Sequence, residues 1–204
     1  MQLPSPPLLV ISDRSQARRP MIEIAAAAFA GGCRWFSLRE KDLPTAERRV
    51  LLGELVALGR QYGATVMAHD DLDAVIATGA GGVHLPGGSD PAAARVRLSH
   101  GLIGVSAHSP HEAAALIRAG ADYVTISPIF LTDSKPGYGP ALGLAGLAAT
   151  VAAAKGPVVA LAGINLDNAR SCLETGAAGI AVMGEVMHAG DPAATVRALI
   201  TAMQ

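Results

Sequence analysis

The feature that most constrains the fold is a strand-then-helix unit that recurs along the whole chain. Short runs of β-branched and aliphatic residues each precede an Ala- and Leu-rich stretch with helical periodicity. The expected strands are residues 8–12, 33–38, 64–68, 82–85, 102–106, 122–126, 157–161 and 179–183. Their spacing averages about 25 residues. Strands that alternate with helices in this way are typical of a parallel sheet.

Eight such units favour an α/β fold of one domain, a (β/α)8 TIM barrel over residues 1–204. The length is near the roughly 250 residues typical of that fold. Glycine-containing joints such as Ala30-Gly31-Gly32 are helix C-caps that lead directly into short strands. A doubly wound open sheet is the alternative, and the absence of a G-x-G-x-x-G turn favours the barrel.

Composition narrows the classes of partner. A net charge of −1 gives no reason to expect nucleic acid or a membrane surface as partner. Cys33 and Cys172, the only two cysteines, lack the spacing of a metal site or redox motif. The sequence shows neither a basic leader segment nor an apolar run of about 18 residues. We therefore expect a cytoplasmic protein that acts on small molecules, and a homo-oligomer is compatible with the sequence.

Residues that follow the strands of a barrel meet at one rim, where enzymes of this fold work. In this chain those positions hold cationic, acidic, histidine and hydroxyl side chains and two glycine turns, whereas the opposite rim is mostly Ala and Gly. The residues are Arg39, Lys41, His69, Asp70, Asp90, His108, Thr132, Ser134, Lys135, Gly163 and Gly184. This asymmetry predicts an enzyme.

Two anion sites are expected at this rim. The turns at Gly163 and Gly184 follow the last two strands, the usual phosphate site of the fold. The long loop after the sixth strand carries two hydroxyls and an ammonium within residues 132–135, which suits a phosphate group. A larger anion is therefore expected near Arg39, Lys41 and Lys135, with Mg²⁺ on Asp70.

Each of these positions has a simpler alternative that the sequence leaves open. The loop and the Arg39-Glu40-Lys41 run could be solvated surface. Asp70 and Asp90 could cap the helices that follow them, and Asp90 precedes a proline as an N-cap does. His108 lies near a helix start and could be structural.

Several short segments together carry a family resemblance. They are Leu9–Arg14, Leu38-Arg39-Glu40-Lys41, Gly82-Val83-His84-Leu85, residues 103–109, Gly120–Val124, Ser127-Pro128-Ile129-Phe130, residues 132–135, and Ala162-Gly163-Ile164 with Asn168. In order and spacing, over nearly the whole chain, they resemble the thiamine phosphate synthase/thiazole tautomerase (ThiE/TenI) family.

The resemblance implies a reaction and a set of roles. A pyrimidine diphosphate loses pyrophosphate, and the nitrogen of a thiazole phosphate captures the resulting cation. By resemblance, the catalytic candidates are Arg39, Lys41, Lys135 and His108. The substrate-binding candidates are Ser37, His69, Thr132, Ser134, Gly163, Met183 and Gly184, and the Mg²⁺ ligand candidates are Asp70 and Asp90.

The chain also departs from the synthase pattern. Ser37 replaces a glutamine, His69 an asparagine and Gly184 a serine, and the loop that carries Asp90 displaces this aspartate by one residue. The Leu85–Ser89 loop looks more like the tautomerase branch, in which a histidine at the His108 position moves a proton. The complete set of pyrophosphate-binding residues favours the synthase. A tautomerase, or a barrel that binds thiazole or thiamine phosphates without catalysis, remains an alternative.

Overall fold

In the computed structural model, which describes residues 2–132 and 139–204, eight parallel strands close into a barrel in the order β1-β2-β3-β4-β5-β6-β7-β8. The strands are β1 (Leu8–Ile11), β2 (Trp35–Leu38), β3 (Thr65–His69), β4 (Gly82–Leu85), β5 (Leu102–Ala107), β6 (Tyr123–Ile126), β7 (Val158–Leu161) and β8 (Gly179–Val182). The register is continuous, and β1 pairs with β8 through Leu9 and Ala181. The predicted (β/α)8 barrel is confirmed.

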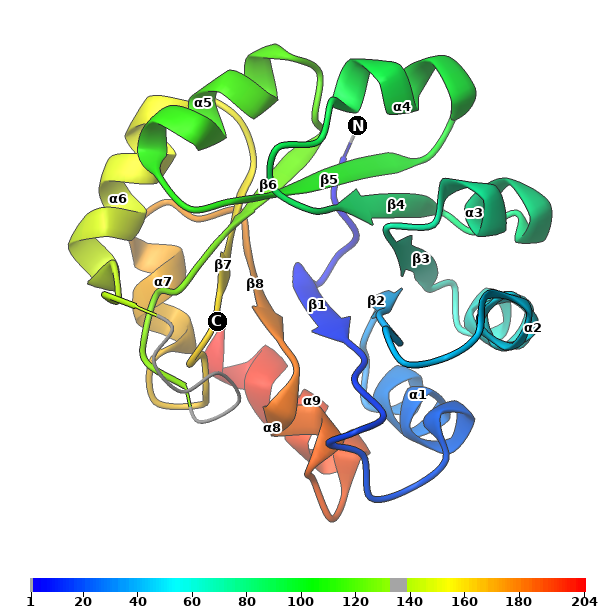
Figure 1. Ribbon diagram of the computed structural model, residues 1–204. Coiled ribbons are helices and arrows are strands. Elements are labelled where there is room, and N and C mark those ends of the chain that lie inside the picture. The colour runs from blue at the N-terminus through cyan, green and yellow to red at the C-terminus, as the bar shows by residue number, and fades with distance from the viewer. Residues whose placement is uncertain (1, 133–138) are drawn as a thin grey trace.

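Helices surround the strands on the outside (Figure 1). They are α1 (Met21–Ala30), α2 (Thr45–Gln61), α3 (Leu72–Thr78), α4 (Pro91–Arg97), α5 (Pro110–Arg118), α6 (Gly143–Ala154), α7 (Ala169–Glu174), α8 (Gly184–Met187) and α9 (Pro192–Ala202). No helix within residues 2–132 and 139–204 is both long and apolar enough to cross a membrane.

Polar side chains set two of the helix starts. The helix α7 begins at Ala169, because Asn168 closes a turn before it. The Asn168 side chain accepts a hydrogen bond from the Asn165 N–H and donates one to the Gly163 carbonyl, each at 2.9 Å. The helix α5 begins at Pro110 because the Ser109 side chain caps it.

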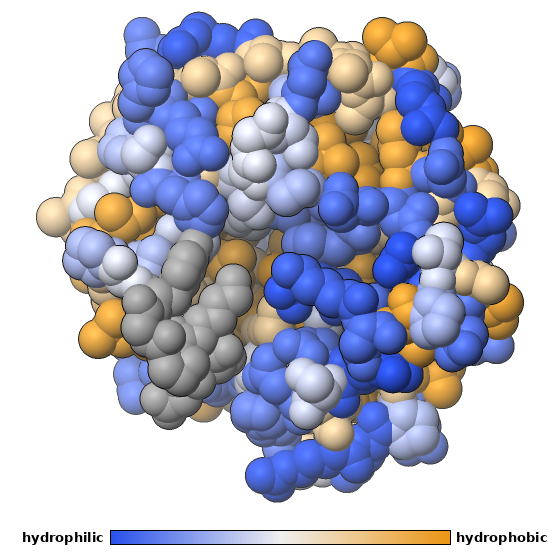
Figure 2. Space-filling model, in the orientation of Figure 1, coloured by the Kyte–Doolittle hydropathy of each residue, from blue (hydrophilic) through white to orange (hydrophobic). Residues whose placement is uncertain are grey.

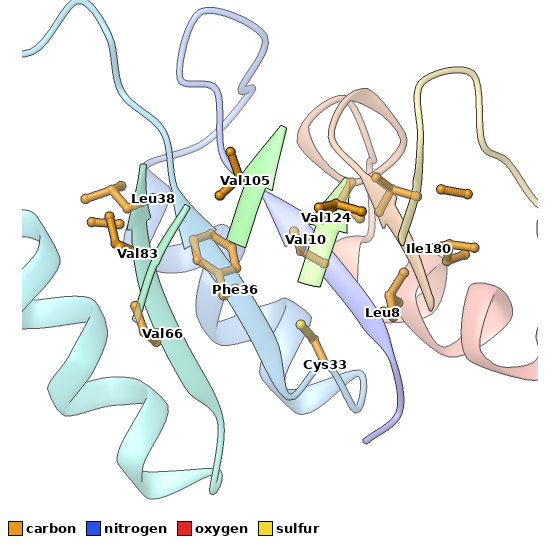
Figure 3. Packing of buried hydrophobic residues seen from close by; sticks show 14 of the residues in the cluster. Leu8, Val10, Cys33, Phe36, Leu38, Val66, Val83, Val105, Val124 and Ile180 are labelled. Carbon is orange, nitrogen blue, oxygen red and sulfur yellow. The ribbon is translucent and has the colours of Figure 1, made fainter. Parts of the chain in front are cut away.

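Strand residues alternate between two apolar layers. One set points outward against the helices and builds the larger core, in which Val10, Phe36, Val66 and Val83 lie on neighbouring strands (Figure 3). The other set fills the barrel interior and includes Leu9, Ile11, Trp35, Met67 and Tyr123. Alternate residues of a barrel strand share one side, so this register fixes which residues reach the interior.

The interior holds one large phenol because a neighbouring strand leaves room for it. A Cβ at Gly104 would lie 2.1 Å from the Tyr123 ring, so only glycine fits there. The Trp35 ring packs edge-on against Tyr123 at 4.9 Å between centroids. Above this aromatic layer, Ser37, His69 and Ser106 bring polar side chains toward the carboxyl ends of β2, β3 and β5.

Candidate active site

Two neighbouring cavities lie at the carboxyl ends of the strands. The first, of about 510 Å³, lies beside the ends of β6, β7 and β8. The second, of about 630 Å³, lies beside the ends of β2 to β5. Arg39, Ser127, Leu161 and Met183 line both cavities. Figure 2 shows hydrophilic residues gathered around the middle of one molecular face, where the surface is hollowed.

The residues predicted from the strand ends divide between the two cavities. Lys41, His69, Asp70 and His108 line the second cavity. Thr132, Gly163 and Gly184 line the first. The barrel thus brings together residues that lie up to 145 positions apart, from Arg39 to Gly184.

Arg39 stands at the junction of the cavities, held by the loop after β1. Its backbone N–H donates to Ser12 Oγ at 2.8 Å, and its guanidinium lies 3.8 Å from the Asp13 carboxylate. Burial raises the pKa of Asp13, but hydrogen bonds from Ser15 and Gln16 and the Arg39 charge outweigh it, so the pKa lies below its ordinary value. Asp13 therefore stays charged and restrains the Arg39 head group.

The next residue, Glu40, is a carboxylate with 2% exposure that lines the second cavity. Its Oε2 accepts a hydrogen bond from the Arg14 N–H at 2.8 Å. Its Oε1 is buried and has no hydrogen-bond partner in the part of the chain that the structure describes. An orphaned carboxylate oxygen of this kind is costly unless another donor or a cation reaches it.

Asp70 stands directly after β3 in a left-handed backbone conformation, with a φ of 49°. Its N–H donates to the His84 carbonyl at 2.9 Å, which ties the turn to β4. The following Asp71 caps α3 by accepting from the Ala74 N–H, and it pairs with Arg48. The helix cap thus falls to Asp71, and Asp70 lines the second cavity.

Ser37, His69 and His84 form a polar path below that cavity. Ser37 is fully buried, and its Oγ lies 3.2 Å from His69 Nδ1. The His69 and His84 rings pack at 4.6 Å between centroids. Burial lowers the pKa of His84 to about 3, so this imidazole is neutral near pH 7. Ser37 supports the cavity from beneath.

His108 follows β5 and has a fixed ring orientation. Its Nδ1 lies 3.0 Å from the Ser127 carbonyl, which can only accept, so Nδ1 carries the proton of that hydrogen bond. Its backbone N–H donates to Glu112 Oε2 at 2.8 Å. This arrangement directs Nε2 toward the Gly87 side of the cavity, since a Cβ at Gly87 would lie 3.7 Å from it.

The turn after β7, which lines the first cavity, needs glycine at position 163. Its φ is 65°, and a Cβ would lie 2.6 Å from both the Leu131 carbonyl oxygen and Phe130 Cβ. A side chain at this position would push the turn after β7 away from the segment after β6. Gly184 begins α8, and Gln16 lies beside it, donating to Asp13 at 2.7 Å and to the Met183 sulfur at 3.4 Å.

Of the predicted residues that the structure describes, Ser37 and Asp90 line neither cavity. Asp90 caps α4, where its side chain accepts from the Ala92 N–H at 2.9 Å, and it is absent from the residues that line either cavity. Ser134 and Lys135 lie outside the described residues.

Whether the residues present fit a divalent cation can be judged from their chemistry. No group of three or more His, Cys, Asp or Glu residues in the described ranges could hold a metal alone. Asp70 and the orphaned Glu40 nevertheless line the same cavity as Arg39, Lys41 and Arg48. One or two carboxylates beside a polyphosphate site is the usual protein share of a Mg²⁺ site, so the donor set fits.

Sequence reasoning missed several residues that line the cavities. Ser106 and Ser127 stand at or just after strand ends, so the rule that found His69 could have found them. Other cavity residues lie away from the strand ends, so no strand-end signal marks them. Gln16 lies in the loop between β1 and α1, Arg48 lies on α2, and His188 directly follows α8.

Comparisons with known proteins agree with this geometry. Residues 8–186 match the thiamine monophosphate synthase family. A putative thiamine-phosphate synthase of Geobacter sulfurreducens is 41% identical over 95% of this chain and 92% of that protein. The thiamine-phosphate synthase of Moorella thermoacetica is 39% identical over 94% and 92%.

Solved structures show the same relationship. The thiamine phosphate pyrophosphorylase of Pyrococcus furiosus superposes with a TM-score of 0.87 at 36% identity, covering 96% of this chain and 94% of that one. A 3-hexulose-6-phosphate synthase, at 20% identity and a TM-score of 0.74, shares the fold alone. The chain belongs to the thiamine monophosphate synthase family.

Proposed function

We propose that this protein is a thiamine phosphate synthase, a transferase that joins a hydroxymethylpyrimidine diphosphate to a thiazole phosphate and releases pyrophosphate. The observation that carries the proposal is the pair of adjoining cavities that share Arg39, Ser127, Leu161 and Met183. Two substrates that must react with each other need adjoining sites, so that their reacting atoms can meet. Cavities of 510 and 630 Å³ each have room for one such substrate.

The distribution of charge supports one assignment of the two substrates to the two cavities. The second cavity holds Arg39, Lys41 and Arg48, which suit a diphosphate. The first cavity offers the Gly163 and Gly184 turns to a single phosphate, with Thr132 nearby. The thiazole nitrogen would then face the pyrimidine at the junction of the two cavities, which Ser127 and Met183 line.

The protein's part in the reaction is electrostatic and geometric. Arg39, Lys41 and Arg48 stabilise the charge that grows on the departing pyrophosphate, and the rings are held in line for capture. Asp70, with Glu40 as a second carboxylate, would hold Mg²⁺, which when bound adds positive charge beside the diphosphate. Asp13 keeps Arg39 at the junction of the two substrates.

A thiazole tautomerase is the second candidate, favoured by the fixed His108 ring in the second cavity. An imidazole with one nitrogen bound to a carbonyl can exchange a proton at the other. The purified protein should be assayed for pyrophosphate release from the pyrimidine diphosphate with an aromatic thiazole phosphate. Proton exchange on the non-aromatic tautomer should be measured in parallel. Proton exchange without pyrophosphate release would replace the synthase with the tautomerase, and neither activity would leave a phosphate-binding barrel.

A further inference from the structure

A buried histidine in the barrel links two hydroxyl groups that lie in different environments. His84 on β4 is 1% exposed. Its Nδ1 lies 3.0 Å from the Tyr123 hydroxyl, which is fully buried, and its Nε2 lies 3.0 Å from Ser106 Oγ. Ser106 lines the second cavity. A chain of hydrogen bonds thus runs from the closed interior to the wall of the cavity.

The direction of these hydrogen bonds follows from the other contacts of Tyr123. A neutral imidazole carries one N–H, and its other nitrogen accepts. If Nδ1 carried the proton, the Tyr123 hydroxyl would have to donate to the Met67 sulfur at 3.8 Å, a weak acceptor. If Tyr123 donates to Nδ1 instead, the proton lies on Nε2 and is donated to Ser106 Oγ. The second arrangement gives the Tyr123 hydroxyl a ring nitrogen as acceptor in place of a weakly accepting sulfur, so the Tyr123 contacts favour it.

We propose that Tyr123 and His84 are positioning residues that fix the Ser106 hydroxyl as a hydrogen-bond donor to an anion in the second cavity. Because Ser106 Oγ accepts from His84 Nε2–H, its own proton must go to another acceptor. The cavity that Ser106 lines also holds Arg39, Lys41 and Arg48, so an anion supplies that acceptor. A donor oriented before the ligand arrives needs no reorganisation on binding. The proposal rests on the proposed function, in which the anion is a diphosphate.

The packing around the chain restricts it to this arrangement. Glycine at position 104 is what allows the Tyr123 ring to reach His84, since a Cβ there would lie 2.4 Å from the Tyr123 hydroxyl oxygen. Thr125 Oγ1 also approaches His84 Nε2, at the longer distance of 3.3 Å. Thr125 stands on the same strand as Tyr123 but outside the path to the cavity, so it supplies a matched control.

The tautomer can be measured directly by ¹⁵N NMR on histidine-labelled protein near pH 7, with the His84 signals identified by their loss in His84→Gln. Wild-type His84 should carry its proton on Nε2. Tyr123→Phe removes the donor to Nδ1 and should move the proton to Nδ1, with Ser106 then donating to Nε2. Thr125→Val should keep the wild-type tautomer. A wild-type proton on Nδ1 would overturn the proposal.

The effect on anion binding is tested with inorganic pyrophosphate by calorimetry. Ser106→Ala should weaken binding about tenfold and Tyr123→Phe about three- to tenfold, the range expected for one hydrogen bond. The double variant should bind as Ser106→Ala does, because Tyr123 acts only through Ser106. Thr125→Val should bind as the wild type does. Additive losses in the double variant would contradict the positioning role.

The outcomes separate this proposal from the proposed function. An Nδ1 proton beside normal pyrophosphate binding contradicts the hydrogen-bond chain alone. A wild type that binds no pyrophosphate contradicts the diphosphate site of the proposed function, and with it the role of Ser106 as donor to an anion, whatever the tautomer of His84.

Discussion

The guanidinium of Arg48 on α2 lies 2.9 Å from the carboxylate of Asp71 at the start of α3. Asp71 is 8% exposed and also caps α3, so a helix outside the barrel fixes the end of β3. The adjacent Asp70 takes its left-handed conformation at this anchored turn. The Arg48–Asp71 pair therefore supports the wall of the second cavity.

Removal of this cation should destabilise the protein. Arg48→Met leaves the Asp71 carboxylate without its partner, and we expect the free energy of unfolding to fall by about 2–3 kcal/mol, less than a fully buried pair would cost. Urea denaturation measures this. The neighbouring exposed Arg49 is the control, and Arg49→Met should change stability by less than about 0.5 kcal/mol. Equal effects of the two substitutions would contradict the anchoring role.

Buried His84 should make the stability depend on pH. Burial lowers its pKa from 6.5 to about 3, so between these values the unfolded chain binds a proton that the folded chain does not. Stability should therefore fall as pH drops through this window, by up to about 1.4 kcal/mol per pH unit from this group. Unfolding free energies of the wild type and His84→Gln from pH 7 to 4 measure the slope. An identical slope in both proteins would show that His84 takes up no proton on unfolding, and would contradict the lowered pKa of His84 in the folded chain.

Asp90 should behave as a helix cap. Asp90→Ala removes the acceptor for the Ala92 N–H, and we expect a loss of about 1 kcal/mol in unfolding free energy with unchanged Mg²⁺ affinity. Asp90→Asn should keep most of that stability, because asparagine caps equally well. Thermal denaturation and Mg²⁺ titration of both variants decide the role, and a weaker Mg²⁺ affinity in Asp90→Asn would make Asp90 a ligand.

Asp70 should act on the metal instead. Asp70→Asn removes a charge from the second cavity, so pyrophosphate should bind with nearly the same affinity with and without Mg²⁺. Thiazole phosphate binding should be unchanged, since we assign it to the first cavity. Calorimetric titrations with each ligand test both statements. Wild-type Mg²⁺ dependence in the variant would exclude Asp70 as a ligand.

His108 distinguishes the two enzymes. Coupling of the substrates needs no proton transfer at the bond-forming nitrogen, so His108→Asn should keep the rate of pyrophosphate release within about tenfold. Loss of a general acid or base would cost about 10²- to 10⁴-fold. Steady-state release of pyrophosphate measures this. A loss in the larger range would assign His108 a proton-transfer step.

The sequence by itself determined the barrel and the rim at which the chemistry lies. The strand-helix period is a local property, so it predicted eight units and placed Arg39, His69 and Asp70 at carboxyl ends. The family segments added the reaction class, because their order and spacing survive in this chain.

Only the tertiary structure decided how the polar residues are paired. The sequence left the roles of cap and ligand open for both Asp70 and Asp90, whereas the structure gives the caps to Asp71 and Asp90 and leaves Asp70 at a cavity. Arg48 bonds to Asp71, 23 residues away, and Tyr123 bonds to His84, 39 residues away. Closure of the barrel sets those contacts, because the register of each strand on the next determines which inward side chains meet, and no local pattern encodes that register.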